Sequence, residues 1–127
     1  AGDARGVYRN TNLDLRTYKR LQMFVHNEAF INDATNLKNG DISLFVRMGS
    51  DVKNNYYEYE IPLMVTPPGH YSNNSSADRL AVWPNENMLD LDLDILTAVK
   101  KNRNAEKMAG NPDVSYVQRY QEQDPNL

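Results

Sequence analysis

Hydrophobic residues alternate with polar ones in three separate stretches of this 127-residue chain. The stretches are residues 18–26, 42–48 and 56–65. A β-strand places successive side chains on opposite faces, so each stretch would present one apolar side and one polar side. An antiparallel sheet can leave its polar face in water, which makes antiparallel pairing the natural setting for such strands. The pattern therefore predicts a β-rich fold.

Turn-forming residues separate these predicted strands. Residues 49–55 are polar and join the second stretch to the third, which predicts a long hairpin. Asn39 and Gly40 supply a tight turn just before the second stretch. Pro62 cannot donate a backbone hydrogen bond, so we expect the third strand to lie at a sheet edge or to carry a bulge there.

A fourth strand and a helix are predicted in the last third of the chain. Residues 88–93 alternate as a strand does. Beyond them the spacing changes, because Leu93, Leu96 and Val99 recur at the interval of a helical stripe. This change predicts a strand that passes directly into one helix near residues 93–109.

The sequence also marks both ends of that helix. Asp92 or Asp94 can act as the N-cap, since an Asp side chain accepts hydrogen bonds from the first backbone N–H groups of a helix. Gly110 and Pro112 would stop the helix. Residues 110–127 are polar and weakly patterned, so we expect them to form a tail or arm.

The expected architecture is mainly β: an antiparallel β-sandwich of the jelly-roll or galactose-binding-like type, with that one helix. Residues 1–127 would form a single domain fragment, with the sandwich core at about residues 15–109. The apolar sides of the strands and the helical stripe would fill the interior. The predicted core residues are Leu21, Met23, Val25, Ile42, Leu44, Val46, Tyr57, Tyr59, Ile61, Leu63, Leu89, Leu91, Leu96 and Val99.

Composition argues against several classes of protein. The chain has 14 Lys and Arg against 17 Asp and Glu, a formal net charge of −3, and this acidic balance argues against a nucleic-acid-binding module. It has no cysteine, which excludes disulfides, thiolate zinc sites and Cys nucleophiles. The longest uncharged stretch, residues 61–77, is interrupted by prolines and a glycine, so it cannot span a bilayer.

One motif resembles the opening of a calcium-binding loop. Asp90, Asp92 and Asp94 stand at alternate positions. An EF-hand loop needs Gly at its sixth position and Glu at its twelfth, whereas this chain has Ile95 and Lys101 there. We therefore expect the three carboxylates to lie on the solvent side of a strand and to bind no calcium.

Other polar residues form no recognisable catalytic set. His26 and His70 are far apart and lack the spacing of metal ligands, so His26 is interpreted as a solvated side chain on its strand. Glu58 and Glu60 would point the same way into water. No Gly-x-Ser-x-Gly motif or phosphate-binding glycine loop is present. We predict that the domain is not an enzyme and has no cofactor or metal site.

Five residues are candidates for contact with a partner or a glycan. Tyr56, Tyr71 and Trp83 are aromatic, and exposed aromatic side chains on β-sandwiches are one way of binding sugars. The alternative is that such rings pack inside, since Tyr and Trp are highly buried on average. Asp51 and Lys53 come from the predicted hairpin loop, where a partner protein could dock.

Several long strings of the sequence resemble the SprA/Sov family. The resemblance covers residues from about 7 to 104, in one order and without large gaps. These strings are longer and more specific than generic motifs. They are residues 14–26, 47–51, 54–63, 82–87 and 99–104.

The resemblance implies a fragment of a very large outer-membrane protein of Bacteroidetes. Members of the SprA/Sov family form the translocon of the type IX secretion system, which exports cargo to the cell surface and supports gliding motility. This chain would then be a domain of that protein that does not itself span the membrane and that faces the periplasm or the cell exterior. Its partners would be other translocon proteins or exported cargo. Excision could leave a strand edge unpaired and favour a homodimer.

Two functions from different classes follow. The first is a non-catalytic structural or docking domain of the secretion translocon, which would hold accessory proteins through the loop of residues 49–55. The second is a carbohydrate-binding β-sandwich module at the cell surface, which would use Tyr56, Tyr71 or Trp83.

Overall fold

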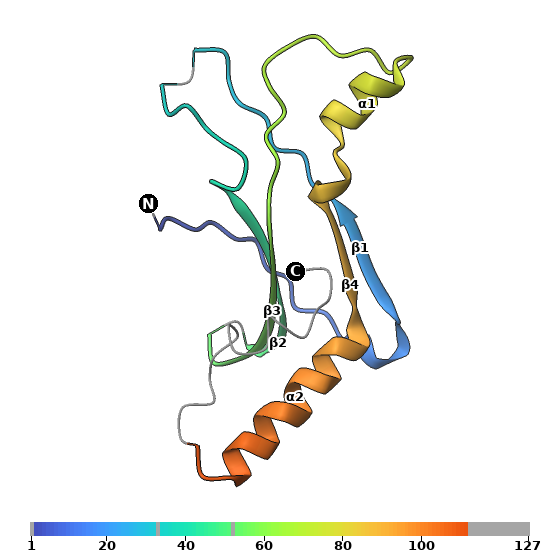
Figure 1. The fold of residues 1–127 in the computed structure, drawn as a ribbon. Coiled ribbons are helices and arrows are strands. Elements are labelled where there is room, and N and C mark those ends of the chain that lie inside the picture. Colours follow the sequence, from blue (N-terminus) through green and yellow to red (C-terminus); the bar gives the residue numbers. More distant parts are fainter. Residues whose placement is uncertain (1, 33, 52, 112–127) are drawn as a thin grey trace.

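A computed structural model describes residues 2–32, 34–51 and 53–111. Within these ranges, four strands form two separate antiparallel sheets, β1 with β4 and β2 with β3 (Figure 1). The strands are β1 (Arg20–Phe24), β2 (Ser43–Asp51), β3 (Asn55–Pro62) and β4 (Met88–Asp92). The helices are α1 (Ser76–Val82) and α2 (Leu93–Met108), and the short 3-10 helices are η1 (Leu15–Thr17) and η2 (Asn85–Asn87).

The predicted hairpin is present as β2 and β3. Val46 lies opposite Tyr59 and Leu44 opposite Ile61, so the apolar sides of the two alternating stretches coincide. The register shifts between Gly49 and Asp51, close to the turn. Pro62 is the last residue of β3, a place where its missing N–H breaks no continuous ladder.

The second sheet joins segments that are distant in the sequence. β1 pairs with β4, so that Leu21 lies opposite Leu91 and Met23 opposite Leu89. β1 is shorter than the predicted 18–26, because its partner begins only at Met88, after the turn of η2. The backbone N–H of Val25 still donates to the carbonyl of Asn87 at 3.0 Å, which extends the contact by one residue.

A single cluster of buried side chains connects the two sheets. β3 and the residue just beyond it contribute to the cluster, as do β4 and the first residue of α2. Leu89 and Leu91 have no exposed surface. The buried apolar residues are Tyr59, Ile61, Leu63, Leu89, Leu91 and Leu93. Five of these six were expected in the core, and Leu93 is an addition.

Two predicted core positions are wrong. Met23 is 43% exposed and Ile42 is 41% exposed. Ile42 precedes β2, where its carbonyl accepts from Leu63 N–H but its side chain lies outside the covered part of the sheet. Met23 lies on a two-stranded sheet, which is too narrow to cover every apolar residue on its inner face.

The architecture differs from the expected sandwich. The described part of the chain is a small mixed α/β unit with two two-stranded sheets and two α-helices. A jelly roll has eight strands in two sheets, and four short strands cannot build one. The antiparallel pairing is as predicted, whereas the jelly-roll or galactose-binding-like topology is a correction. The physical reason is that each sheet has only two strands among the described residues, too few for the layers of such a sandwich.

The helix α2 begins and ends close to its predicted limits. The Asp92 side chain is the N-cap and accepts from the N–H of Asp94 at 3.0 Å. After Met108 the chain reaches Gly110, whose φ of +87° favours glycine. Residues 112–127, most of the predicted tail, lie outside the described residues.

The helix α1 is not among the elements predicted from the sequence. Ser75 is its N-cap and accepts from the N–H of Asp78 at 3.2 Å. A Ser followed three residues later by an acidic residue is a known helix-start signal. Figure 1 shows α1 near one end of the β1–β4 sheet and α2 at the other.

Candidate docking groove

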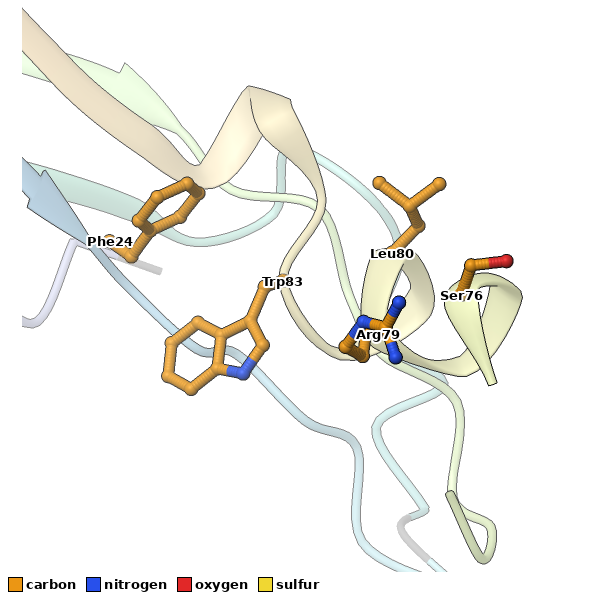
Figure 2. A pocket seen from close by; sticks show the side chains of 5 residues that line it. All are labelled: Phe24, Ser76, Arg79, Leu80 and Trp83. Atoms are coloured by element: carbon orange, nitrogen blue, oxygen red, sulfur yellow. The ribbon is translucent and has the colours of Figure 1, made fainter. Parts of the chain in front are cut away.

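Three large apolar side chains lie close together and exposed to solvent where α1 meets the end of β1. Phe24 is 49% exposed, Leu80 57% and Trp83 46%. Together with Ser76 and Arg79 they line an open pocket of about 650 Å³ (Figure 2). We call these five residues the Trp83 groove.

Three of the groove residues lie on one face of α1. Ser76, Arg79 and Leu80 stand at positions i, i+3 and i+4 of the helix, and Trp83 is the residue that follows its last turn. Phe24 comes from β1 and forms the opposite wall. Its ring meets the Trp83 indole edge to face, with centroids 6.2 Å apart and an interplanar angle of 77°. This arrangement is a preferred one for aromatic pairs, so it helps to position the indole.

Two side chains tie the C-terminal end of α1 to the rest of the domain. The hydroxyl of Thr66, which is 1% exposed, donates to the carbonyl of Ala81 at 2.8 Å. The Nδ1 atom of His26 lies 2.9 Å from the carbonyl of the next residue, Val82. The last carbonyls of a helix have no partner inside it, so both contacts satisfy groups that the helix leaves open.

His26 has acceptors at both ring nitrogens. Its Nε2 atom lies 3.2 Å from a carboxylate oxygen of Glu28, and its ring lies over Trp83 with centroids 5.6 Å apart. Only the protonated ring can donate to the Val82 carbonyl and to Glu28 at once. The carbonyl first, and then the carboxylate, raise the pKa of His26 above its ordinary value of 6.5. The sequence-based interpretation of a merely solvated histidine therefore missed its role in fixing α1.

Arg79 places a positive charge inside the groove. Its Nη1 atom donates to the carbonyl of Asn73 at 2.5 Å. Among the described residues, no carboxylate forms an ion pair with it. Figure 2 shows its guanidinium between Trp83 and Leu80. The groove therefore combines apolar surface with a cation that has no acidic partner within that part of the chain.

The three aromatic candidates do not form one platform. The Arg47 guanidinium lies 4.4 Å from the centroid of the Tyr56 ring and pairs with Glu58, so it covers one face of that ring. Tyr71 is half-buried and its hydroxyl donates to the carbonyl of Pro67 at 2.5 Å. No ring contact joins either tyrosine to Trp83 in the described ranges. Trp83 alone belongs to the groove.

Asp51 organises the hairpin turn. Its side chain accepts from the N–H groups of Lys53 and Asn54, at 2.9 and 2.6 Å, and from the Asn55 side chain at 2.7 Å. These hydrogen bonds, that of the Asn54 N–H foremost, lower the pKa of Asp51 to about 2. Lys53 is exposed. Of the two loop candidates, Lys53 is therefore the one whose side chain is presented to solvent.

Comparison with known families identifies the chain's relatives. The SprA_N family, described as motility related/secretion protein, matches residues 1–127. The chain belongs to this SprA family. The match covers the whole sequence given and confirms the resemblance drawn from the residue strings. No individual characterised protein matches the chain significantly.

Two of the three aspartates in the calcium-like motif of this SprA-family chain have structural partners. The Asp90 carboxylate forms an ion pair with Arg20 at 2.7 Å, and Asp92 caps α2. Within residues 2–32, 34–51 and 53–111, no three or more His, Asp or Glu side chains form a group that could hold a metal ion. In the same ranges, no helix has both the length and the apolar character needed to cross a membrane.

Sequence reasoning missed four of the five groove residues of this family member. Ser76, Arg79 and Leu80 are not among the candidates, although the capping signal at Ser75 and their helical spacing mark α1. Phe24 carries a different signal. It is a large apolar residue on the side of β1 that was predicted to be polar, and such a residue is informative when it stays exposed.

Proposed function

We propose that this domain is a non-catalytic docking domain of a secretion translocon, the type IX system, which in gliding species also serves motility. The observation that carries the proposal is the Trp83 groove, an exposed apolar pocket whose Arg79 has no carboxylate partner among the described residues. Membership in a motility and secretion family supports the setting. The domain would belong to an outer-membrane protein and face the periplasm or the cell surface. Its partner would be a polypeptide of the translocon or of its cargo.

The groove is a place where exposed apolar side chains adjoin one another. The described residues expose twelve large apolar side chains, and three of them line this one pocket. Single exposed apolar residues are normal, but adjoining ones mark interaction sites. Covering them releases roughly 25 cal/mol per Å² of apolar surface removed from water. Phe24, Leu80 and Trp83 are such a group.

A charge introduced into the groove tests this function in the source bacterium. Leu80→Glu in the intact secretion protein places a charge on an exposed apolar residue, so folding is expected to persist while docking is lost. Met108→Glu on α2 is the matched control, because Met108 is 89% exposed and lies outside the groove. We expect a several-fold loss of cargo secretion for Leu80→Glu alone, at unchanged protein level. Normal cargo secretion by the Leu80→Glu variant would show that the groove is not needed for the proposed docking function.

A carbohydrate-binding module at the cell surface is the second candidate. The half-exposed Trp83 indole favours it, because sugars stack on such rings. Calorimetry with envelope polysaccharides tests it. Heat of binding that disappears in Trp83→Ala but persists in Tyr56→Ala would support this function, and the absence of heat with every polysaccharide would end it.

We also propose that the isolated domain can dimerise through a strand edge. Each described sheet has two strands, so each strand has one edge that no described strand covers. Such edges tend to pair with other chains. Analytical ultracentrifugation tests the idea, and a single monomeric species at high concentration would contradict it.

A further inference from the structure

The Trp83 groove has two chemically different parts within a short length. Phe24, Leu80 and Trp83 supply apolar surface, and Arg79 supplies the charge. A guanidinium is planar and has five N–H donors in fixed directions. Among the described residues, Arg79 donates to one acceptor, the Asn73 carbonyl. A carboxylate is the acceptor that fits the remaining N–H donors best, since a guanidinium and a carboxylate can form two parallel charge-assisted hydrogen bonds.

The spacing of the two parts limits the shape of the occupant. Arg79 and Trp83 are four residues apart, or about 6 Å along the axis of a helix. Two residues of an extended chain span about 6.6 Å, and side chains two apart point to the same face of that chain. An extended polypeptide could therefore place an apolar side chain against Trp83 and Phe24 and a carboxylate against Arg79.

We propose that the groove binds a polypeptide segment in which an apolar side chain stands two residues from a carboxylate, with Arg79 as the residue that selects the acid. The inference rests on the proposed docking function and names the class of its partner. Charge complementarity decides between occupants. One Arg on a chain of net charge −3 is too little for an anionic membrane surface, which is usually recognised by several basic residues.

A sugar fits the groove less well than such a peptide. Sugar hydroxyls that are taken out of water need hydrogen-bond partners, and burial without them is costly. The polar side chains that line the groove are those of Ser76 and Arg79. An apolar peptide side chain makes no such demand on the surface formed by Phe24, Leu80 and Trp83.

Intrinsic fluorescence can test this proposal directly, because Trp83 is the single tryptophan of the chain. The 127-residue protein is titrated with the peptide acetyl-Gly-Leu-Ser-Asp-Gly-amide. Three controls replace Asp by Asn, replace Leu by Ala, or make Leu and Asp adjacent. We expect a saturable change in Trp83 emission with the first peptide, and affinity at least about tenfold lower for the Asn peptide. Equal affinities for the Asp and Asn peptides would overturn the proposal.

Two protein variants and two other ligands complete the test. Arg79→Gln should bind the Asp and Asn peptides equally, whereas Lys100→Gln, an exposed change on α2, should keep the preference. A preference that persists in Arg79→Gln contradicts the role of this residue. Phosphatidylglycerol vesicles or dextran that change the emission more strongly than the Asp peptide would also overturn the proposal, in favour of lipid or sugar.

The peptide experiment and the secretion experiment can fail separately. If the Asp and Asn peptides bind equally while Leu80→Glu still abolishes secretion, the partner class is wrong and the docking function stands. If the Asp peptide is preferred while Leu80→Glu cells secrete normally, the groove is specific but the proposed function is wrong.

Discussion

The Nδ1 atom of His26 lies 2.9 Å from the carbonyl oxygen of Val82, the last residue of α1. The chain just after β1 is thereby joined to the helix that carries most of the groove. The same ring lies over Trp83 and reaches Glu28 through its Nε2 atom. The contact that holds α1 therefore depends on whether the His26 ring is protonated.

Stability should depend on pH through this histidine. The folded-state pKa of His26 is raised, so the protonated ring stabilises the fold. This contribution is fully present below the unfolded-state pKa, near 6.5, and is lost as pH rises through the folded-state value. We expect the melting temperature of His26→Gln to fall furthest below that of the unmodified protein at pH 5–6.

The second histidine supplies the control. His70 is exposed, and His70→Gln should follow the unmodified protein at every pH. Thermal unfolding followed by circular dichroism between pH 5 and 9 measures all three proteins. Parallel profiles for His26→Gln and the unmodified protein would show that the His26 contacts do not stabilise the fold.

The side chain of a buried asparagine, Asn87, satisfies both backbone groups of Met64, as a neighbouring strand would. Asn87 has no exposed surface; its Oδ1 accepts from Met64 N–H at 2.6 Å and its Nδ2 donates to the Met64 carbonyl at 2.9 Å. Asn87→Ala leaves both backbone groups without this partner. The expected loss is about 2–6 kcal/mol, since each of the two unsatisfied groups costs about 1–3 kcal/mol.

Urea unfolding measures this loss. Asn73→Ala is the matched control, because Asn73 is exposed and its hydrogen bond with Arg79 uses the backbone carbonyl, which alanine keeps. The control should stay within about 0.5 kcal/mol of the unmodified protein. An equally small change for Asn87→Ala would mean that water replaces the lost hydrogen bonds.

Leu91 is expected to be among the most sensitive core positions. It is fully buried in β4, opposite Leu21. Leu91→Ala should lower the free energy of unfolding by about 2–5 kcal/mol through lost burial and the cavity left behind. Leu80→Ala, the same chemical change at a 57% exposed position, should cost far less. Similar denaturation midpoints for the two variants would contradict the assigned core.

The hairpin requires glycine at one position. A Cβ atom on Gly49 would lie 2.1 Å from the Asn55 carbonyl oxygen and 2.5 Å from the Cα of Tyr56, both backbone atoms that cannot rotate away. Gly49→Ala should therefore cost about 1–3 kcal/mol by overpacking. Gly6→Ala meets nothing within 4 Å and serves as the control. Equal melting temperatures for the two variants would show that the turn can rearrange.

The strands and α2 could be predicted because their signals are local. Alternation placed Leu44, Val46 and Tyr59 on the same face of one hairpin, and Asp92 marked the start of α2. The pairing of β1 with β4 had no local signal, since Leu21 and Leu91 meet across 70 residues. The described strands form two sheets of two strands each, smaller than the layers of the expected sandwich.

The groove was hidden from sequence for a related reason. α1 has seven residues and none of them is buried, so its sequence has no apolar stripe that would predict a helix. Its tie to Thr66 and His26 is made by long-range hydrogen bonds, whose partners no periodic pattern reveals. Trp83 was identified as a candidate, but its neighbours Phe24 and Arg79 come from elements that only the fold brings together.

Photocrosslinking in living cells tests the docking function most directly. A benzoylphenylalanine is placed at Leu80 of the intact secretion protein, and at Met108 as the control site, since both side chains are exposed. We predict an adduct from position 80 alone, weakened by Arg79→Glu, whose crosslinked peptide has an apolar residue two positions from Asp or Glu. No adduct at position 80, or the same adducts from both sites, would contradict docking at the groove.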